Sequence, residues 1–132
     1  MLEKFFKKGY KNDAGYDIIV DDYIVFPPKS MTTFELNQTI TPKKGSCAML
    51  IARTSAAKQG LIISMCPIDA DYTGKITAIV FNANDKPIEY APGEAFCQAV
   101  FVKLAKCTLK KGEYHIVKKG KRGRNKIGST GR

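Results

Sequence analysis

The stretch Cys66-Pro67-Ile68-Asp69-Ala70-Asp71-Tyr72-Thr73-Gly74-Lys75 lies between two apolar runs, Leu61 to Ile63 and Ile76 to Phe81. It places two carboxylates, a tyrosine and a glycine on what its composition predicts to be a tight bend. A carboxylate at the end of a strand is well placed to accept a proton from water, and a nearby tyrosine can lie flat against a ring. On these residues alone, the stretch is either a catalytic turn or a structural β-turn.

The rest of the chain has the pattern of an all-β barrel or sandwich, because its apolar residues alternate or run in short blocks between Gly, Pro, Asn and Asp. One short helix is expected from Thr54 to Gln59, ended by Gly60. The 132 residues suit one compact domain. We expect a β domain over 1–117 and a flexible basic arm over 118–132. Strands are expected at 16–20, 23–26, 30–35, 45–51, 61–65, 75–82, 88–90, 94–103 and 108–109.

Composition narrows the function classes. No apolar run approaches the ~20 residues of a membrane helix, and the N-terminus is a poor secretion signal, so we expect a cytoplasmic protein without membrane contact. The four cysteines show no C-x-x-C spacing and His115 is the single histidine. This disfavours a zinc site and histidine-activated nucleophiles, and predicts reduced thiols. The net charge of +10 favours anionic partners such as nucleotides, nucleic acid or acidic membrane surfaces.

The basic arm from Lys118 to Arg132 contains seven Lys and Arg residues, four glycines and no acid. In its final segment, Ile127-Gly128-Ser129-Thr130-Gly131, successive backbone N–H groups and two hydroxyls can converge on an anion. Arg122 can offer a bidentate fork to a phosphate. From these residues alone, two functions of the arm therefore stay open: a lid over a polyphosphate and a nucleic-acid-binding segment.

Three further segments carry polar groups beside expected strands. Arg53-Thr54-Ser55 opens the short helix, where free N–H groups favour an anion, although Thr54 or Ser55 could also be a simple N-cap. Asp17 follows a turn and could bind an arginine, the water around a metal, or its own turn. Gln98 lies among half-buried residues, as a hydrogen bond at the core edge or as a ligand contact.

Five segments of the chain, in the order in which they follow one another along the sequence, resemble the signature motifs of the trimeric dUTPases. The resemblance covers nearly the whole chain, and the ordered set is far more specific than any one motif. It implies a jelly-roll subunit, a distorted β-barrel, that assembles into a homotrimer with active sites at subunit interfaces. It also implies Mg²⁺-assisted hydrolysis of dUTP to dUMP and pyrophosphate by water attack at the α-phosphorus, which keeps uracil out of DNA and supplies dUMP. The segments are Asp13 to Ile18, Arg53 to Ser55, Ile68 to Gly74, Gly93 to Gln98, and Arg122 to Gly131.

The resemblance also implies roles for residues at the nucleoside. Asp69 matches the base that deprotonates the attacking water. Tyr72 matches the ring that stacks on the deoxyribose and excludes a 2′-hydroxyl, and Ile68 and Ile63 belong to the hairpin that receives uracil. Ile127 matches the lid residue that covers the base, where the family usually has a phenylalanine that stacks on it.

At the phosphates, the resemblance implies contacts shared between neighbouring subunits and the lid. Asp17 matches an acid that supports the phosphate and metal-water network. Mg²⁺ is expected on the triphosphate oxygens and water, with no direct protein ligand. The matching phosphate-binding positions are Arg53, Thr54, Ser55, Gln98, Arg122, Gly128, Ser129 and Thr130.

The chain departs from the family at Cys66-Pro67, which replaces a Gly-containing pair, and at Lys75, where an acid or amide is usual. Two other functions remain open. One is a dCTP deaminase, or a bifunctional deaminase and dUTPase, of the same fold. The other is a nucleic-acid-binding or partner-binding protein that uses the basic arm.

Overall fold

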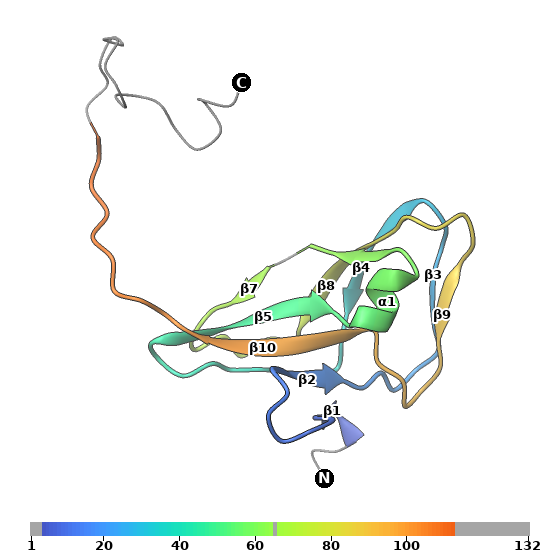
Figure 1. Ribbon diagram of the computed structural model, residues 1–132, viewed down its shortest axis with the longest axis horizontal. Coiled ribbons are helices and arrows are strands. Elements are labelled where there is room, and N and C mark those ends of the chain that lie inside the picture. Colours follow the sequence, from blue (N-terminus) through green and yellow to red (C-terminus); the bar gives the residue numbers. More distant parts are fainter. Residues whose placement is uncertain (1–3, 65, 113–132) are drawn as a thin grey trace.

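A computed structural model describes residues 4–64 and 66–112 (Figure 1). This part of the chain forms ten strands and one short helix. The expected all-β fold with a single short helix is therefore confirmed. Within the described residues the strands form three sheets rather than one closed barrel, and no helix is long and apolar enough to cross a membrane.

The largest sheet has five antiparallel strands in the order β1-β2-β10-β5-β7. Its centre is the pairing of β5 with β10, which runs over seven residue pairs from Cys97 opposite Ala52 to Lys103 opposite Ser46. Three consecutive residues of β10 also pair with β2, so β10 lies between β2 and β5. The strands are β1 (Phe6–Lys7), β2 (Gly15–Ile18), β5 (Ser46–Ala52), β7 (Pro67–Ile68) and β10 (Cys97–Lys103).

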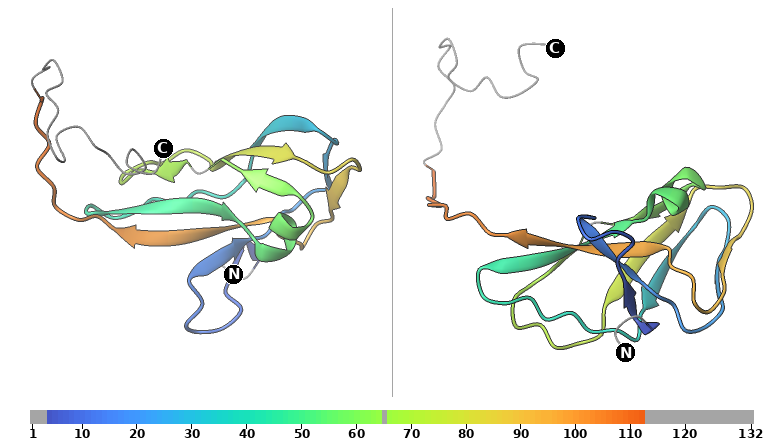
Figure 2. Two further views of the ribbon diagram at one scale, coloured as in Figure 1. Left: turned by 45° about the horizontal axis from the view of Figure 1, so that its top comes forward. Right: turned by 60° about the horizontal axis from the view of Figure 1, so that its bottom comes forward.

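Two smaller sheets complete the fold, and Figure 2 shows the three-stranded sheet as a layer apart from the five-stranded one. The first has the order β4-β8-β6 and the second pairs β3 with β9. On β8, buried Ala78, Val80 and Asn82 alternate with more exposed residues, the period expected of a strand with one face on a core. The strands are β3 (Ile24–Phe26), β4 (Ser30–Glu35), β6 (Leu61–Ile63), β8 (Thr77–Asn82) and β9 (Ile88–Tyr90).

Aromatic rings fill one part of the core. Phe26 and Phe96 are almost completely buried, and their rings meet edge to face with centroids 5.1 Å apart. Phe34 and Tyr90 pack on the same pair. Such aromatic contacts add stability beyond the area that they bury. Phe96 also fixes the start of β10, and its carbonyl accepts a hydrogen bond from the Arg53 N–H at 3.0 Å.

The helix α1 (Thr54–Lys58) follows β5 directly. Its buried residue is Ala56, and it ends at Gln59 before Gly60, whose φ of +100° is a conformation suited to glycine. The expected stop at Gly60 is confirmed. The alternative role of Thr54 or Ser55 as the N-cap does not hold, because Arg53 occupies the N-cap position and makes no side-chain capping bond.

Several strand predictions need correction. Residues 108–109 form no strand, and Leu109 is 88% exposed. Two short strands were not expected, β1 and β7. The strand β7 exists because Pro67 and Ile68 pair with Met49 and Ala48, a distant partner that the local sequence does not reveal. The bend predicted over 66–75 therefore begins only at Asp69.

Candidate active site

The turn after β7 presents Asp69 and Tyr72 together. The Tyr72 N–H donates to the Asp69 carbonyl at 3.3 Å, and the Asp71 N–H donates to the Pro42 carbonyl at 3.2 Å. Asp71 has a φ of +68°, the left-handed conformation that Asp tolerates better than most residues. The two acids therefore differ, since Asp71 shapes the turn and Asp69 stands at its entrance.

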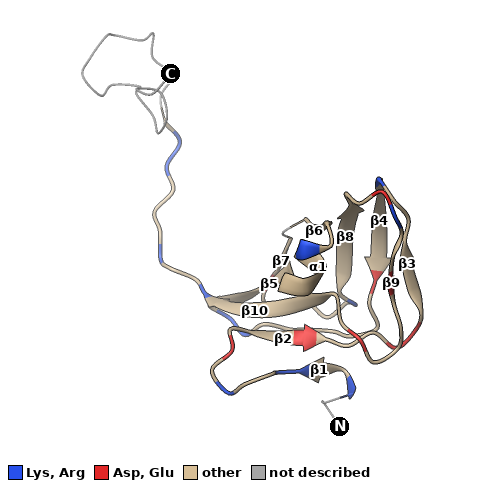
Figure 3. Ribbon diagram, turned by 45° about the vertical axis from the view of Figure 1, so that its right-hand side comes forward, with Lys and Arg blue, Asp and Glu red and all other residues tan. Residues whose placement is uncertain are grey.

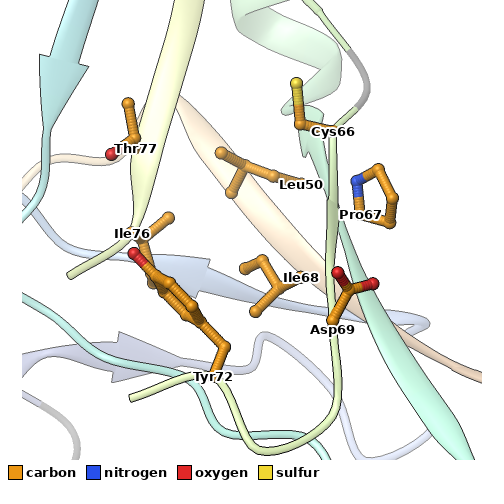
Figure 4. Close-up of a pocket in the computed structure, with 8 residues that line it drawn as sticks. All are labelled: Leu50, Cys66, Pro67, Ile68, Asp69, Tyr72, Ile76 and Thr77. Carbon is orange, nitrogen blue, oxygen red and sulfur yellow. The ribbon is translucent and has the colours of Figure 1, made fainter. Parts of the chain in front are cut away.

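A cavity of about 250 Å³ lies against this turn (Figure 4). Its apolar floor is formed by Leu50, Ile68 and Ile76. In Figure 4, the carboxylate of Asp69 and the ring of Tyr72 stand on opposite sides of Ile68. An apolar floor with a few convergent polar groups is typical of a small-molecule pocket. We call it the nucleoside pocket, after the role that the resemblance in the sequence implies for Asp69 and Tyr72.

Cys66, Pro67 and Thr77 complete the lining of the nucleoside pocket. The structure thus brings together three of the five residues expected at the nucleoside. A fourth, Ile127, lies outside the described residues, and the fifth, Ile63, is not among the lining residues in the described part of the chain. It lies on β6 opposite Val80, half-buried against the core, and its expected contact with the base stays a prediction.

The ring of Tyr72 is held in place from both ends. Its hydroxyl donates to the Lys75 carbonyl at 2.8 Å, and its backbone carbonyl accepts a hydrogen bond from the Thr41 hydroxyl at 2.6 Å. Gly74 lies under the ring, because a Cβ there would come within 2.7 Å of the Tyr72 Cζ atom. Tyr72 is still 42% exposed, so a ligand can reach this residue although its hydroxyl and its backbone are held.

A second group of polar residues meets where β2, β10 and β5 lie side by side. Gln98 of β10 is opposite Asp17 on one side and Ile51 on the other. Arg53 follows the end of β5, and its Nε lies 3.2 Å from Oδ1 of Asp17. The same guanidinium donates from Nη1 to the Ala95 carbonyl at 3.3 Å. Three residues far apart in the sequence thus form one polar cluster.

These residues line an open cavity of about 620 Å³, which we call the anion cradle. Thr54 and Ser55 also line it, and both are exposed. Because neither hydroxyl caps the helix, both can donate to a ligand. Gly15 lies against Gln98, since a Cβ there would overlap the Gln98 side-chain oxygen. Gln98 itself is half-buried and donates to the Ala52 carbonyl at 3.4 Å.

Lys58 is a cradle residue that the sequence analysis missed. It lies four residues after Thr54 on α1, so the two side chains share one face of the helix. The spacing of four residues between Thr54 and Lys58 on the expected helix was the sequence signal that could have revealed it. The cradle therefore presents two cationic side chains, Arg53 and Lys58, beside two carboxylates, Asp13 and Asp17.

The chain beyond β10 carries further positive charge. Residues 104–112 contain Lys106, Lys110 and Lys111 and no acid, as Figure 3 shows. A basic surface of this kind raises the local concentration of anionic ligands.

Among the described residues, the lining of the nucleoside pocket and that of the anion cradle share no member. The expected lid residues Arg122, Ile127, Gly128, Ser129 and Thr130 lie outside the described residues.

The fold and the two pockets define an all-β protein that combines an apolar pocket with an arginine-bearing anion site. A family model described as dUTPase matches residues 3–131, and the chain belongs to the dUTPase family. The expected family is thereby confirmed.

Two relatives illustrate the range of the family. The Pol polyprotein of Ovine maedi visna related virus is 32% identical over 120 residues, which cover 90% of this chain and 11% of the polyprotein. The deoxyuridine 5'-triphosphate nucleotidohydrolase of Candida albicans is 26% identical over 126 residues, covering 95% of this chain and 79% of the relative. The chain thus spans about a tenth of the viral polyprotein that it matches.

A solved structure shows the same fold. A mutant dUTPase of Staphylococcus bacteriophage 80alpha with dUpNHpp superposes with a TM-score of 0.77 at 21% identity, covering 96% of this chain and 90% of that chain. This chain therefore has the jelly-roll fold of the dUTPases, as its motifs predicted.

Proposed function

We propose that this protein hydrolyses dUTP to dUMP and pyrophosphate by water attack at the α-phosphorus. The observation that carries the proposal is the nucleoside pocket, in which a carboxylate and a fixed tyrosine ring flank an apolar floor. The Candida albicans relative, a deoxyuridine 5'-triphosphate nucleotidohydrolase, supports the proposal.

Asp69 is the proposed general base. Its side chain lies at the pocket wall in an exposed position, where it can orient a water molecule and take its proton. One positioned carboxylate is enough for such a step, and no covalent nucleophile is needed. Most of the rate enhancement then comes from placement and from neutralisation of the phosphate charge.

Tyr72 is the proposed reader of the sugar. A ring that is held at both ends keeps one face against the deoxyribose, and a 2′-hydroxyl would meet that face. A ribonucleotide would then lose ring contact and leave its hydroxyl without a partner. The contribution of Tyr72 is therefore discrimination against UTP as well as affinity.

The anion cradle is the proposed phosphate site. Arg53 offers a planar guanidinium, which suits phosphate oxygens, and Thr54, Ser55 and Gln98 offer further donors. Asp17 holds the guanidinium in place at 3.2 Å.

The cradle also suits Mg²⁺. The Asp17 side chain is 24% exposed and can accept hydrogen bonds from metal-bound water, and carboxylate and water oxygens match the preference of this ion. When bound to the triphosphate, Mg²⁺ would offset its negative charge. The ion is expected to be held by phosphate and water oxygens.

We further propose a homotrimer in which the nucleoside pocket of one copy faces the anion cradle of another. Support comes from the separation of the two sites within one protomer, which share no lining residue in the described chain. Residues 118–132 are the proposed lid, with Arg122, Gly128, Ser129 and Thr130 on the phosphates and Ile127 over the base.

The test is pyrophosphate release from dUTP, dTTP, dCTP and UTP with Mg²⁺ present. We expect turnover of dUTP and little turnover of the other three. No turnover of dUTP would overturn the proposal, and ammonia release from dCTP would favour the deaminase instead. Salt-sensitive DNA binding that is lost without residues 118–132 would indicate a second role for the arm.

A further inference from the structure

The segment before β5 runs beside the turn that carries Asp69 and Tyr72. The Leu36 N–H donates to the Ile76 carbonyl at 2.8 Å, and the Ile76 N–H donates to the Gln38 carbonyl at 2.9 Å. Further along, the Thr41 hydroxyl donates to the Tyr72 carbonyl at 2.6 Å. We call residues 38–42 the strut.

The other end of the strut is anchored near the anion cradle. Gln38 is 6% exposed, and its side-chain amide donates to the carbonyls of Ile19 and Phe5 at 2.5 and 3.1 Å. Ile19 directly follows β2, the strand that carries Asp17. A buried amide with satisfied partners is a rigid attachment. The strut therefore connects the strand of the cradle to the turn of the nucleoside pocket.

The turn needs such external support. Asp71 is in the left-handed region with a φ of +68°, and a residue other than glycine stays there only when neighbouring contacts hold it. Within the turn, the bond from Tyr72 to Asp69 is long, at 3.3 Å. The strut supplies two bonds from outside, from Thr41 to Tyr72 and from Asp71 to Pro42.

We propose that Thr41 is a positioning residue for the reaction, a role that rests on the proposed function. It is not among the residues that line the nucleoside pocket, so it acts through Tyr72. Its hydroxyl fixes the backbone of Tyr72, and the ring then takes the angle at which it meets the sugar. Loss of this bond lets the ring turn away, and discrimination between dUTP and UTP falls.

The first test compares Thr41→Val, which removes the donor, with Thr41→Ser, which keeps it. We expect Thr41→Val to lower kcat/KM for dUTP roughly 3- to 10-fold, as loss of one hydrogen bond does, and to reduce the preference for dUTP over UTP. Thr41→Ser should keep both kcat/KM and the preference for dUTP close to those of the wild type. Thr33→Val is the matched control, because Thr33 is exposed on β4 opposite Ile79, away from both pockets. Wild-type selectivity in Thr41→Val would overturn the proposal.

The second test needs no activity. Hydrogen exchange over residues 69–75 should be several-fold faster in Thr41→Val than in the wild type or Thr33→Val, because the Asp71 and Tyr72 amides lose their support. Unchanged exchange would overturn the proposal. So would faster exchange in an enzyme with unchanged selectivity, since the bond would then stabilise the turn without serving the reaction. If the wild type failed to hydrolyse dUTP, the proposed function would be wrong. Hydrogen exchange over residues 69–75 would still show whether Thr41 stabilises the turn.

Discussion

Arg53 and Asp17 meet at 3.2 Å between Nε and Oδ1, although Asp17 lies on β2, Arg53 follows β5, and β10 separates these two strands. Their side chains are 40% and 24% exposed, so solvent screens the pair and its contribution to stability is at most about 1 kcal/mol. The pair instead fixes the plane of the guanidinium, together with the bond to the Ala95 carbonyl. Its importance lies in orientation rather than in folding.

Replacement of Arg53 by lysine should therefore damage function more than stability. A lysine keeps the charge but loses the planar fork. We expect the KM for dUTP to rise roughly 10-fold or more, with a melting temperature close to that of the wild type. The control is Lys29→Ala, which removes a surface pair with Asp85 at 3.5 Å and should leave the kinetics unchanged. A normal KM in Arg53→Lys would argue against a phosphate contact.

The two acids of the turn should respond differently to the same change. Asp69→Asn should reduce turnover about 100-fold or more, as expected for loss of a general base, and should keep binding of a non-hydrolysable dUTP analogue in titration calorimetry. Asp71→Asn should stay active, because Asn tolerates the left-handed conformation that Asp71 adopts. An active Asp69→Asn variant would refute the assignment of the base.

Gly15 should not tolerate a methyl group. In Gly15→Ala the new Cβ would overlap the Gln98 side chain and push it out of the cradle. We expect a stability loss of about 1–3 kcal/mol from overpacking and weaker binding of the analogue. Gly112→Ala is the control, because a Cβ at Gly112 meets nothing within 4 Å. Equal stability and binding in the two variants would show that the cradle adapts.

The cysteines should differ in reactivity towards iodoacetamide. Burial raises the pKa of the Cys97 thiol, with a smaller contribution from the Asp17 carboxylate, so the reactive thiolate is scarce there. Cys107 is exposed and should react first in the folded protein. Cys66 lines the nucleoside pocket, and a dUTP analogue should slow its alkylation. Mass spectrometry of the labelled peptides measures all three, and rapid labelling of Cys97 would contradict its burial.

The local pattern of the sequence was enough to predict most of the strands. β4 and β9 begin and end where alternation and turn residues place them, because each is bounded by residues that favour turns. Several other strands are shorter than expected at one end. β1 and β7 were missed, since each has only two residues and is formed by pairing with a distant strand.

The same distinction applies to the site. Asp69, Tyr72, Arg53 and Gln98 stand in segments with recognisable motifs, and the structure places them in two pockets. Gln38 and Thr41 have no such signal, because their role depends on hydrogen bonds to residues 19 and 72. Long-range contacts of this kind are invisible to local reading. Ile63 belongs to the hairpin that the resemblance places at the base, yet it is not among the residues that line the nucleoside pocket of a single protomer.

The outermost strands of the five-stranded sheet are its shortest. β1 ends in Lys7 and β7 begins with Pro67, which has no N–H to offer to an incoming strand. Lysine and proline at such edges discourage strand addition, the first step towards fibres. Pro67 thus has two roles, because it disfavours aggregation at the edge of the sheet and also lines the nucleoside pocket.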